Sequence, residues 1–417
     1  MYQLEASETC ASKPDKCFDF GNGPEPYKDA GAGPYTHYVD NTSPAATNTD
    51  NPYGTAEKPR ASNPTLSTLP AGSVVEVHGG PYVHIAAIYI STNNATQDRP
   101  IFYRGATYDS RPTIEDTTFM VRGHYIIVEN FHFKDTSVDI RPWTTSELVH
   151  HNAMRHTETT GEKTAGHTSS YVDGNPTNDV VFYGNFVHLS TVDRMKENPD
   201  TFEEDNEGFV AGQNSSNVWI VDNDLSGMGG DAAGGGHAAN YTAYNYYIGR
   251  NIMHNTGENA VDLKELENVV VSQNIMYDFT GPSSGSDGTA VVIHYGPVNS
   301  PINAWLIFND ISDSAAKGIQ VGGDNTHEVY LIGNVVHDIH SGTGTGQGFD
   351  TWGSKKIDLV GNTFYDVDNA IKASGTSSSG GLLVFENNIV SNVAASGKVL
   401  SLDDSTYSAV AIVKHNL

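Results

Sequence analysis

The sequence predicts an all-β chain folded as a right-handed parallel β-helix, and three observations lead to this prediction. The 417 residues include 42 glycines and 18% charged residues, a composition typical of many short strands and turns. No window has the periodicity of a long amphipathic helix. A strand-like motif that closes on asparagine recurs along the chain, so we expect a solenoid of stacked coils rather than a row of globular domains.

The repeated motif is a run of alternating apolar residues followed by asparagine, as in HYIIVEN, NVWIVDN and LLVFENN. It closes at Asn130, Asn185, Asn223, Asn251, Asn274, Asn309, Asn334, Asn362 and Asn388. By subtraction, the intervals from Asn185 onward are 38, 28, 23, 35, 25, 28 and 26 residues, which indicates coils with loops of variable length. We interpret these asparagines as an internal ladder at a tight turn, because asparagine tolerates left-handed backbone and its amide can bond the next coil.

A second apolar pair follows each asparagine, as in NFVHL and NIMYD, so each coil contributes more than one strand. Such repeats without helices fit a β-helix whose coils stack at ~4.8 Å. We expect residues 71–417 to form the β-helix. Residues 1–70 lack the repeat and are rich in Pro, Asn, Thr and Gly, so we expect an irregular N-terminal extension that covers the first coil.

The charge and the cysteines limit the partners and the compartment. The formal charge of −27, from 50 acidic and 23 basic residues, argues against a nucleic-acid partner, which needs a basic surface. No run of 18 apolar residues occurs, so we expect no membrane association. Cys10 and Cys17 are predicted to form a small disulfide of an exported protein, with two free thiols as the alternative. We therefore expect a secreted monomer, and we interpret MYQLEASETC as a methionine joined to a mature N-terminus.

A further strand precedes each asparagine strand, as in NAVDLK, TAVVIHYG and QGFDTWG. Period-two alternation sends two ranks of side chains outward from these strands. The first rank holds Val210, Asp262, Val292, Gln320, Asp350 and Lys372, and the second holds Gly212, Lys264, His294, Gly322, Trp352 and Ser374. Lys264 and His294 become neighbours about 5 Å apart, and Asp262 shares their face. The small residues and Trp352 suit a groove that accepts a flat sugar.

Acidic residues precede the coil of Lys264. DTFEEDNEGFVAG contains Asp205 and Glu207, and GMGGDAAGGGHAAN adds Asp231 and His237 one coil later. Oxygen ligands gathered from neighbouring coils can hold Ca²⁺, which takes six to eight of them. We expect Asp205, Glu207 and Asp231 to bind this ion, with an exposed acidic loop as the alternative. The chain has neither EF-hand spacing nor a Cys/His zinc pattern.

These residues resemble the β-helical polysaccharide lyases, most nearly the family nine pectate lyases and more loosely the family six alginate and chondroitin lyases. The likeness rests on DNEGFVAG, on GMGGDA one coil later and on ENAVDLK in the coil after that. The resemblance implies that Glu207 and Asp231 bind calcium and that Lys264 is the Brønsted base. In family six an arginine-histidine-glycine strand follows the base by one coil, where this chain has VVIHYG with His294 and no arginine.

The expected reaction is β-elimination in a uronate polysaccharide of the pectate or alginate kind. Lys264 removes the C5 proton, and His294 or Tyr295 protonates the leaving oxygen or holds the carboxylate. The carboxylate must be neutralised, by Ca²⁺ or an arginine, to stabilise the enolate-like intermediate, and the lysine must have a lowered pKa. The candidate substrate-binding residues are Asp262, Arg250, His237 and Trp352.

Two alternatives to the lyase stay open at the level of sequence. An inverting glycoside hydrolase needs two carboxyl groups ~6.5–9.5 Å apart, and Asp231 with Asp262 is the candidate pair. A non-catalytic, glycan-binding β-helix is the other alternative.

Overall fold

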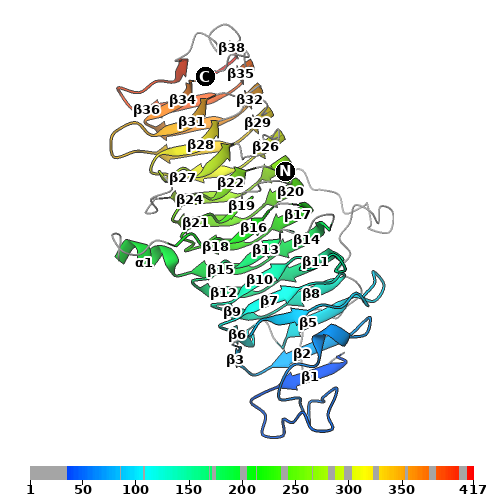
Figure 1. Ribbon diagram of the computed structural model, residues 1–417. Coiled ribbons are helices and arrows are strands. Elements are labelled where there is room, and N and C mark those ends of the chain that lie inside the picture. The colour runs from blue at the N-terminus through cyan, green and yellow to red at the C-terminus, as the bar shows by residue number, and fades with distance from the viewer. Residues whose placement is uncertain are drawn as a thin grey trace.

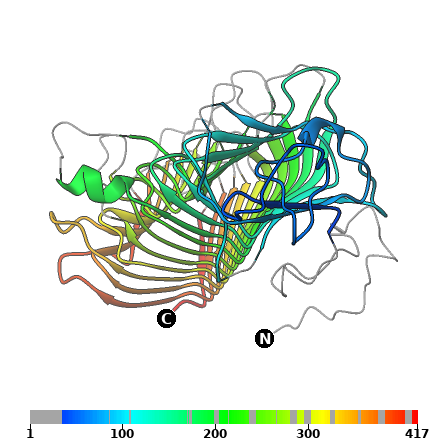
Figure 2. The same ribbon diagram turned by 90° about the horizontal axis from the view of Figure 1, so that it is seen from below.

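The computed structural model describes residues 35–417 except 85, 107–108, 169, 171–174, 198–203, 213, 236–242, 265, 280–286, 295–302, 323–327, 353–355, 375–381 and 403–410. The strands form three long sheets, and each strand pairs in parallel with the strand one coil away. From β2 onward, strands that are consecutive in sequence lie in different sheets. Figure 1 shows the coils stacked from the blue N-terminal end to the red C-terminal end, and Figure 2 shows the stack from below. The predicted right-handed parallel β-helix is confirmed.

The first sheet has 14 strands and contains the strands that lead into the asparagine motif. Its members are β1 (His37–Asp40), β2 (Val74–His78), β5 (Ile101–Gly105), β8 (Ile126–Glu129), β11 (Val149–Arg155), β14 (Thr177–Tyr183), β17 (Ser215–Val221), β20 (Ala243–Gly249), β23 (Leu266–Ser272), β26 (Asn303–Ile307), β29 (Glu328–Ile332), β32 (Lys356–Val360), β35 (Leu382–Glu386) and β38 (Ala411–Lys414).

The second sheet has 12 strands and contains the pair of apolar residues that follows each asparagine. Its members are β3 (Tyr82–Val83), β6 (Thr113–Glu115), β9 (His132–Lys134), β12 (Glu158–Gly161), β15 (Phe186–Leu189), β18 (Asp224–Ser226), β21 (Ile252–Thr256), β24 (Ile275–Phe279), β27 (Asp310–Ser312), β30 (Val335–Ile339), β33 (Thr363–Val367) and β36 (Ile389–Val393).

The third sheet, also of 12 strands, carries the candidate site. Its members are β4 (Ile88–Ile90), β7 (Thr118–Val121), β10 (Ser137–Ile140), β13 (Gly166–Thr168), β16 (Phe209–Ala211), β19 (Ala233–Gly234), β22 (Val261–Lys264), β25 (Val291–His294), β28 (Lys317–Gly322), β31 (Gln347–Trp352), β34 (Asn369–Ala373) and β37 (Leu400–Leu402).

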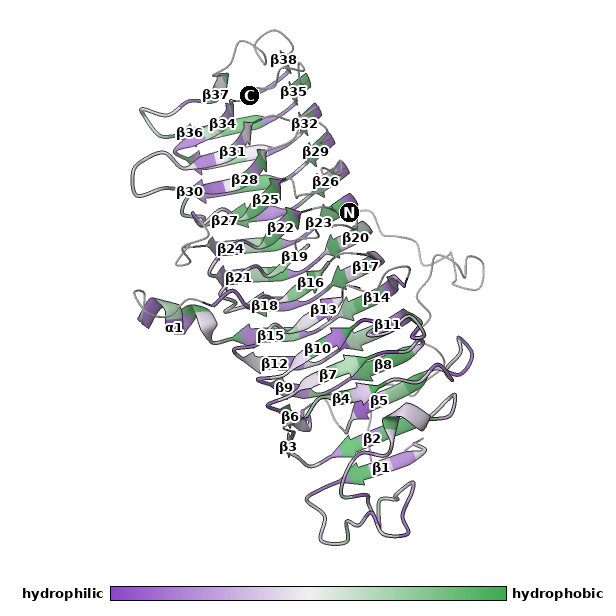
Figure 3. Ribbon diagram, in the orientation of Figure 1, coloured by the Kyte–Doolittle hydropathy of each residue, from purple (hydrophilic) through white to green (hydrophobic). Residues whose placement is uncertain are grey.

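One continuous apolar core fills the inside of the coils. Alternation along each strand turns one set of side chains inward, so Val261 and Leu263 are fully buried on either side of Asp262. The cluster of buried apolar residues extends without a break from Val39 to Phe385. Figure 3 shows the hydrophobic colour concentrated on the strands. Burial of each such side chain contributes about 1.5–3 kcal/mol, so the core fixes which residues point outward.

The predicted asparagine ladder is present from Asn185 to Asn388, and Asn416 extends it by one coil beyond the prediction. Each side-chain Oδ1 accepts hydrogen bonds from the backbone N and the Nδ2 of the asparagine one coil before, as Asn251 does from Asn223 at 3.0 and 2.9 Å. Thr157 ends the ladder on the N-terminal side by donating to Asn185. The buried amides are therefore all used between coils, which rules out a separate catalytic role for them.

The backbone of the ladder turn differs from the prediction. The left-handed residue is the one before each ladder asparagine, for example Asp222 at φ 57° and Arg250 at φ 55°. Asn130 itself has φ 67°, and its backbone N donates to Arg155 O as His156 N does to Tyr183 O one coil later. Asn130 therefore occupies the left-handed position and is not a ladder residue, so the predicted register was wrong there by one residue.

The N-terminal part and the helices add little to the core. Strand β1 pairs in parallel with β2, so the first sheet begins at His37. The chain from residue 41 to residue 73 is irregular apart from the 3₁₀ helix Leu66–Thr68. The helix α1 (Thr191–Glu197) lies beside the stack in Figure 1. No described helix has the length and apolar character needed to cross a membrane. Cys10 and Cys17 lie outside the described residues.

Candidate active site

The outward ranks of the third sheet follow the predicted register. Lys264 pairs with His294 on the next coil, and Asp262 pairs with Val292. The same rank continues through Gln320 and Asp350 to Lys372. The predicted first rank lacked one residue, Gly234. This residue belongs to the two-residue strand β19, which lies between β16 and β22 and places Gly234 between Val210 and Asp262.

Asp262 is the centre of a cluster with Lys264 and His294. Lys264 Nζ forms an ion pair with Asp262 Oδ2, and His294 Nε2 lies 3.1 Å from Asp262 Oδ1. The Asp262 side chain is only 5% exposed, whereas those of Lys264 and His294 are 17% and 30% exposed. The buried carboxylate therefore orients two partly exposed groups, one on each of two adjacent coils, toward the outer face of the sheet.

The three predicted metal ligands lie together at the start of the strands β16 and β19. A Cβ on Gly230 would lie 2.3 Å from Asp205 Oδ1 and 3.4 Å from Glu207 Cγ, so the absence of a side chain there lets both acids pack against the residue before Asp231. Asp231 is buried, and its Oδ1 accepts a hydrogen bond of 3.1 Å from the backbone N of Asn259. Asp205 and Glu207 thus lie beside Gly230, next to Asp231, but the ligand atoms of these three acids do not all come within 4.8 Å of one another. Their binding of a cation stays a prediction.

Buried negative charge accumulates around these residues. Burial raises the pKa of Glu207 to about 7, and the charges of Asp205 and Asp262 add to the shift. Burial and the charge of Asp262 raise the pKa of Asp231 well above its usual range. Burial favours the neutral form of Lys264, but the charges of Asp262 and Asp231 outweigh it and raise the pKa of this amine. By itself, therefore, the site keeps Lys264 protonated, the opposite of the lowered pKa that a lysine base needs.

The acidic group offers the kind of oxygen ligand that calcium prefers. Three carboxylates supply hard oxygen ligands, and Gly230 leaves room for two of them. Burial is the main cause of the raised pKa of Glu207, and the charges of Asp205 and Asp262 add to it. Glu258 adds to this charge, since it acts on Glu207, Asp231 and Lys264. The sequence reading missed Glu258, although it aligns with Gly230 once β19 and β22 are placed in register.

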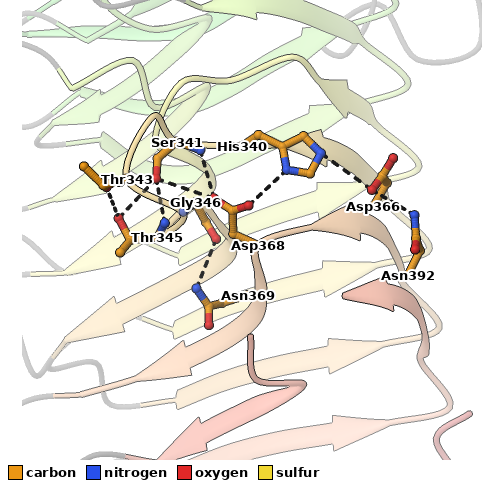
Figure 4. A network of polar contacts seen from close by, with 9 residues as sticks. All are labelled: His340, Ser341, Thr343, Thr345, Gly346, Asp366, Asp368, Asn369 and Asn392. Atoms are coloured by element: carbon orange, nitrogen blue, oxygen red, sulfur yellow. Dashed lines mark hydrogen bonds and ion pairs between the residues drawn. The ribbon is translucent and has the colours of Figure 1, made fainter. Parts of the chain in front are cut away.

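Another group of potential metal ligands lies on the second sheet and consists of Asp338, His340 and Asp366. Among the described residues, this is the group of three whose ligand atoms all lie within 4.8 Å of one another. Figure 4 shows that His340 is already engaged there, with Nδ1 3.0 Å from Asp368 Oδ1. Asp368 also accepts hydrogen bonds from the backbone N of Ser341 and Gly346. This network fastens the loop after β30 to the next coil, a structural role.

The remaining predicted residues are dispersed. Arg250 lies at the turn after β20 on the first sheet, not on the sheet of Lys264, and forms two hydrogen bonds of 2.8 Å with Asp222. Its role in substrate binding stays a prediction. Trp352 does lie on the third sheet, three coils from Lys264, with its indole packed over Gly322. A side chain at Gly322 would displace that ring. His237 and Tyr295 lie outside the described residues.

Comparison with known proteins identifies relatives by structure. No protein-family model and no curated protein matches the chain. The catalytic unit of a GH87 α-1,3-glucanase from Streptomyces thermodiastaticus matches with a TM-score of 0.51 and 14% identity over 92% of this chain and 71% of that one. The A-module of the mannuronan C-5 epimerase AlgE4 from Azotobacter vinelandii matches with a TM-score of 0.49 and 12% identity over 82% and 91%. A GH136 lacto-N-biosidase from Eubacterium ramulus matches with a TM-score of 0.49 and 13% identity over 91% and 67%.

At these identities the comparison concerns the architecture. The α-1,3-glucanase match and the three parallel sheets agree, and the chain is a right-handed parallel β-helix.

Proposed function

We propose that the protein is a secreted, monomeric polysaccharide lyase that cleaves a pectate- or alginate-like uronate polymer by β-elimination. The observation that carries the proposal is the contact of Asp262 with both Lys264 and His294 on the outer face of the third sheet, beside buried carboxylates. Lys264 and His294 are partly exposed, as groups that react with a polymer must be. The structural matches to carbohydrate-acting β-helices are compatible with this proposal.

In the proposed reaction, neutral Lys264 Nζ takes the C5 proton of a uronate residue. The C–H electron pair moves toward the sugar carboxylate and then forms the C4–C5 double bond as the C4–O bond breaks. Protonated His294 donates its proton to the leaving oxygen. Asp262 acts by positioning both groups, because its carboxylate contacts each of them.

Calcium held by Asp205, Glu207 and Asp231 would neutralise the sugar carboxylate and lower the pKa of Lys264. Asp262, Asp231 and Glu258 otherwise favour the ammonium form of Lys264. The net charge of −27 would also repel a polyuronate unless cations screen it. The proposal therefore requires a divalent cation for activity.

A glycoside hydrolase is the second candidate, and one observation favours it. Burial and the charge of Asp262 raise the pKa of Asp231 well above its usual range, and a raised pKa is typical of the general acid of a glycoside hydrolase. Asp262, however, is almost fully buried and is bound by Lys264 and His294, which leaves it poorly placed to activate water. We therefore prefer the lyase.

The products distinguish these functions. Polygalacturonate and alginate are incubated with the protein and Ca²⁺, and the ultraviolet absorbance of the unsaturated uronate product is followed together with reducing ends. The lyase predicts that both signals rise and that EDTA abolishes them. Reducing ends without the absorbance would establish hydrolysis, and binding of the polymers without any product would establish a non-catalytic glycan-binding protein.

A further inference from the structure

A pocket of about 490 Å³ lies at the N-terminal end of the third sheet, remote from Lys264. Strand β4 forms one wall, with Tyr89, and the chain from Asn63 to Ser67 forms another. Arg122, which follows β7, reaches into it together with Glu147 and His84. A volume of this size falls in the range of about 300–1,000 Å³ that is usual for small-ligand sites.

Two aromatic rings flank the guanidinium of Arg122. The Arg122 Cζ lies 4.2 Å from the centre of the Tyr89 ring and 5.2 Å from that of Trp143. These rings are 43% and 60% exposed, so each keeps a large apolar surface toward solvent. An exposed aromatic surface held in place by a cation is suited to pack against the C–H face of a pyranose ring.

The polar groups of the pocket are fixed, and some of them are unused. Arg122 Nη1 lies 3.7 Å from Glu147 Oε1, and the other oxygen of Glu147 accepts hydrogen bonds from the backbone N of Trp143 and Thr144. Arg122 Nε and His84 Nε2 are buried and have no hydrogen-bond partner within the described part of the chain. A buried polar group without a partner costs about 1–3 kcal/mol, so these two atoms leave unmet hydrogen-bonding capacity in residues that line the pocket.

The pocket is aligned with the candidate active site. The register places Tyr89 in the outward rank that runs through Met120, Asp139, His167, Val210 and Gly234 to Asp262. Arg122 follows Met120 by two residues, as Lys264 follows Asp262. From β7 to β22 the sheet order β7-β10-β13-β16-β19-β22 gives five steps, or roughly 24 Å at ~4.8 Å per step.

We propose that this pocket is a distal sugar-binding subsite, which holds a pyranose residue of the same polysaccharide about five residues from the bond that is cleaved. The residues of an extended polysaccharide repeat at nearly the spacing of the coils, so a chain along the outward rank reaches both places. Since Glu147 already neutralises Arg122, the pocket recognises sugar hydroxyl groups rather than a carboxylate. The inference rests on the proposed function only for the position of the cleaved bond.

The test compares long and short ligands. Calorimetry measures binding in the Lys264→Ala background, which prevents cleavage. The ligands are polygalacturonate, alginate, a neutral β-glucan, and oligomers too short to reach from the pocket to Lys264. Tyr89→Ala is expected to weaken binding of at least one polymer about tenfold and to leave short-oligomer binding at the Lys264 end unchanged. Trp143→Ala should behave in the same way. Tyr365→Ala, at a 47% exposed tyrosine on the second sheet, is the matched control and should change neither.

Unchanged polymer binding in both Tyr89→Ala and Trp143→Ala, with circular dichroism as in the parent, would overturn the subsite. So would the lack of binding of every polymer to the intact chain. Loss of polymer binding in these variants, combined with the absence of any unsaturated product from the unsubstituted protein, would retain the subsite and reject the lyase. Formation of unsaturated product, together with polymer binding that Tyr89→Ala does not change, would retain the lyase and reject the subsite.

Discussion

Replacement of Glu207 by glutamine should change the pH dependence of stability in a calculable way. The folded state raises the pKa of this carboxyl group from 4.5 to about 7, chiefly by burial. Between these values the folded protein binds a proton that the unfolded chain releases, so the contribution of Glu207 to stability is full below pH 4.5 and is lost as the pH rises toward 7. At 1.36 kcal/mol per unit, the loss is about 3 kcal/mol.

The assay is urea unfolding of the calcium-free protein at a series of pH values. Glutamine does not titrate. As the pH rises from 4.5 to 7, the free energy of unfolding of Glu207→Gln should therefore increase by about 3 kcal/mol relative to that of the unsubstituted protein. Glu197→Gln, at an exposed position of α1, is the control and should show a constant difference. Saturating Ca²⁺ should stabilise the unsubstituted protein at pH 7 and Glu207→Gln much less.

The reasoning would be refuted by a difference between Glu207→Gln and the unsubstituted protein that does not vary with pH. That result would mean that Glu207 is solvated and ionised in the folded protein, and the argument for a cation at this place would lose its electrostatic basis.

Two further predictions concern the ladder and the acidic group. Asn251→Ala removes hydrogen bonds to Asn223, Ile220 and Asn274 and should lower the free energy of unfolding by about 3 kcal/mol. The control Asn303→Ala removes a hydrogen bond from an exposed row of asparagines and should lower it by about 0.5 kcal/mol or less. Equal losses in the two variants would contradict the role of the buried ladder. Gly230→Ala brings a methyl group against Asp205 and should weaken calcium binding about tenfold in a calorimetric titration, and unchanged affinity would exclude Asp205 as a ligand.

The register of the third sheet could be predicted because strand periodicity and coil stacking are both rigid constraints. The inward residues Val261 and Leu263 leave Asp262 and Lys264 one orientation, and in-register pairing then brings His294 beside Lys264. Strand β19 escaped notice because GGDAAGGG has no apolar alternation to mark two strand residues. Its omission also concealed the alignment of Glu258 with the acidic group.

Other features depend on information that the pattern does not contain. Asparagine is equally suited to a left-handed turn residue and to a ladder residue, so HYIIVEN could not reveal that Asn130 is the former. Arg250 lies next to a ladder residue and seemed available, but only the fold shows that Asp222 binds it. The pocket around Tyr89 and Arg122 lies on coils before Asn185, where the asparagine ladder begins, so the ladder did not indicate the register there.

The most direct test of the central claim is the rate at which Lys264→Ala forms unsaturated product from polygalacturonate or alginate in Ca²⁺. Loss of the base should reduce the rate about 10²–10⁴-fold relative to the unsubstituted protein, with thermal unfolding showing that the variant is folded. Lys372→Ala, in the first outward rank of the same sheet, should retain full activity. Full activity in Lys264→Ala, or equal losses in both variants, would contradict the assignment of Lys264 as the base.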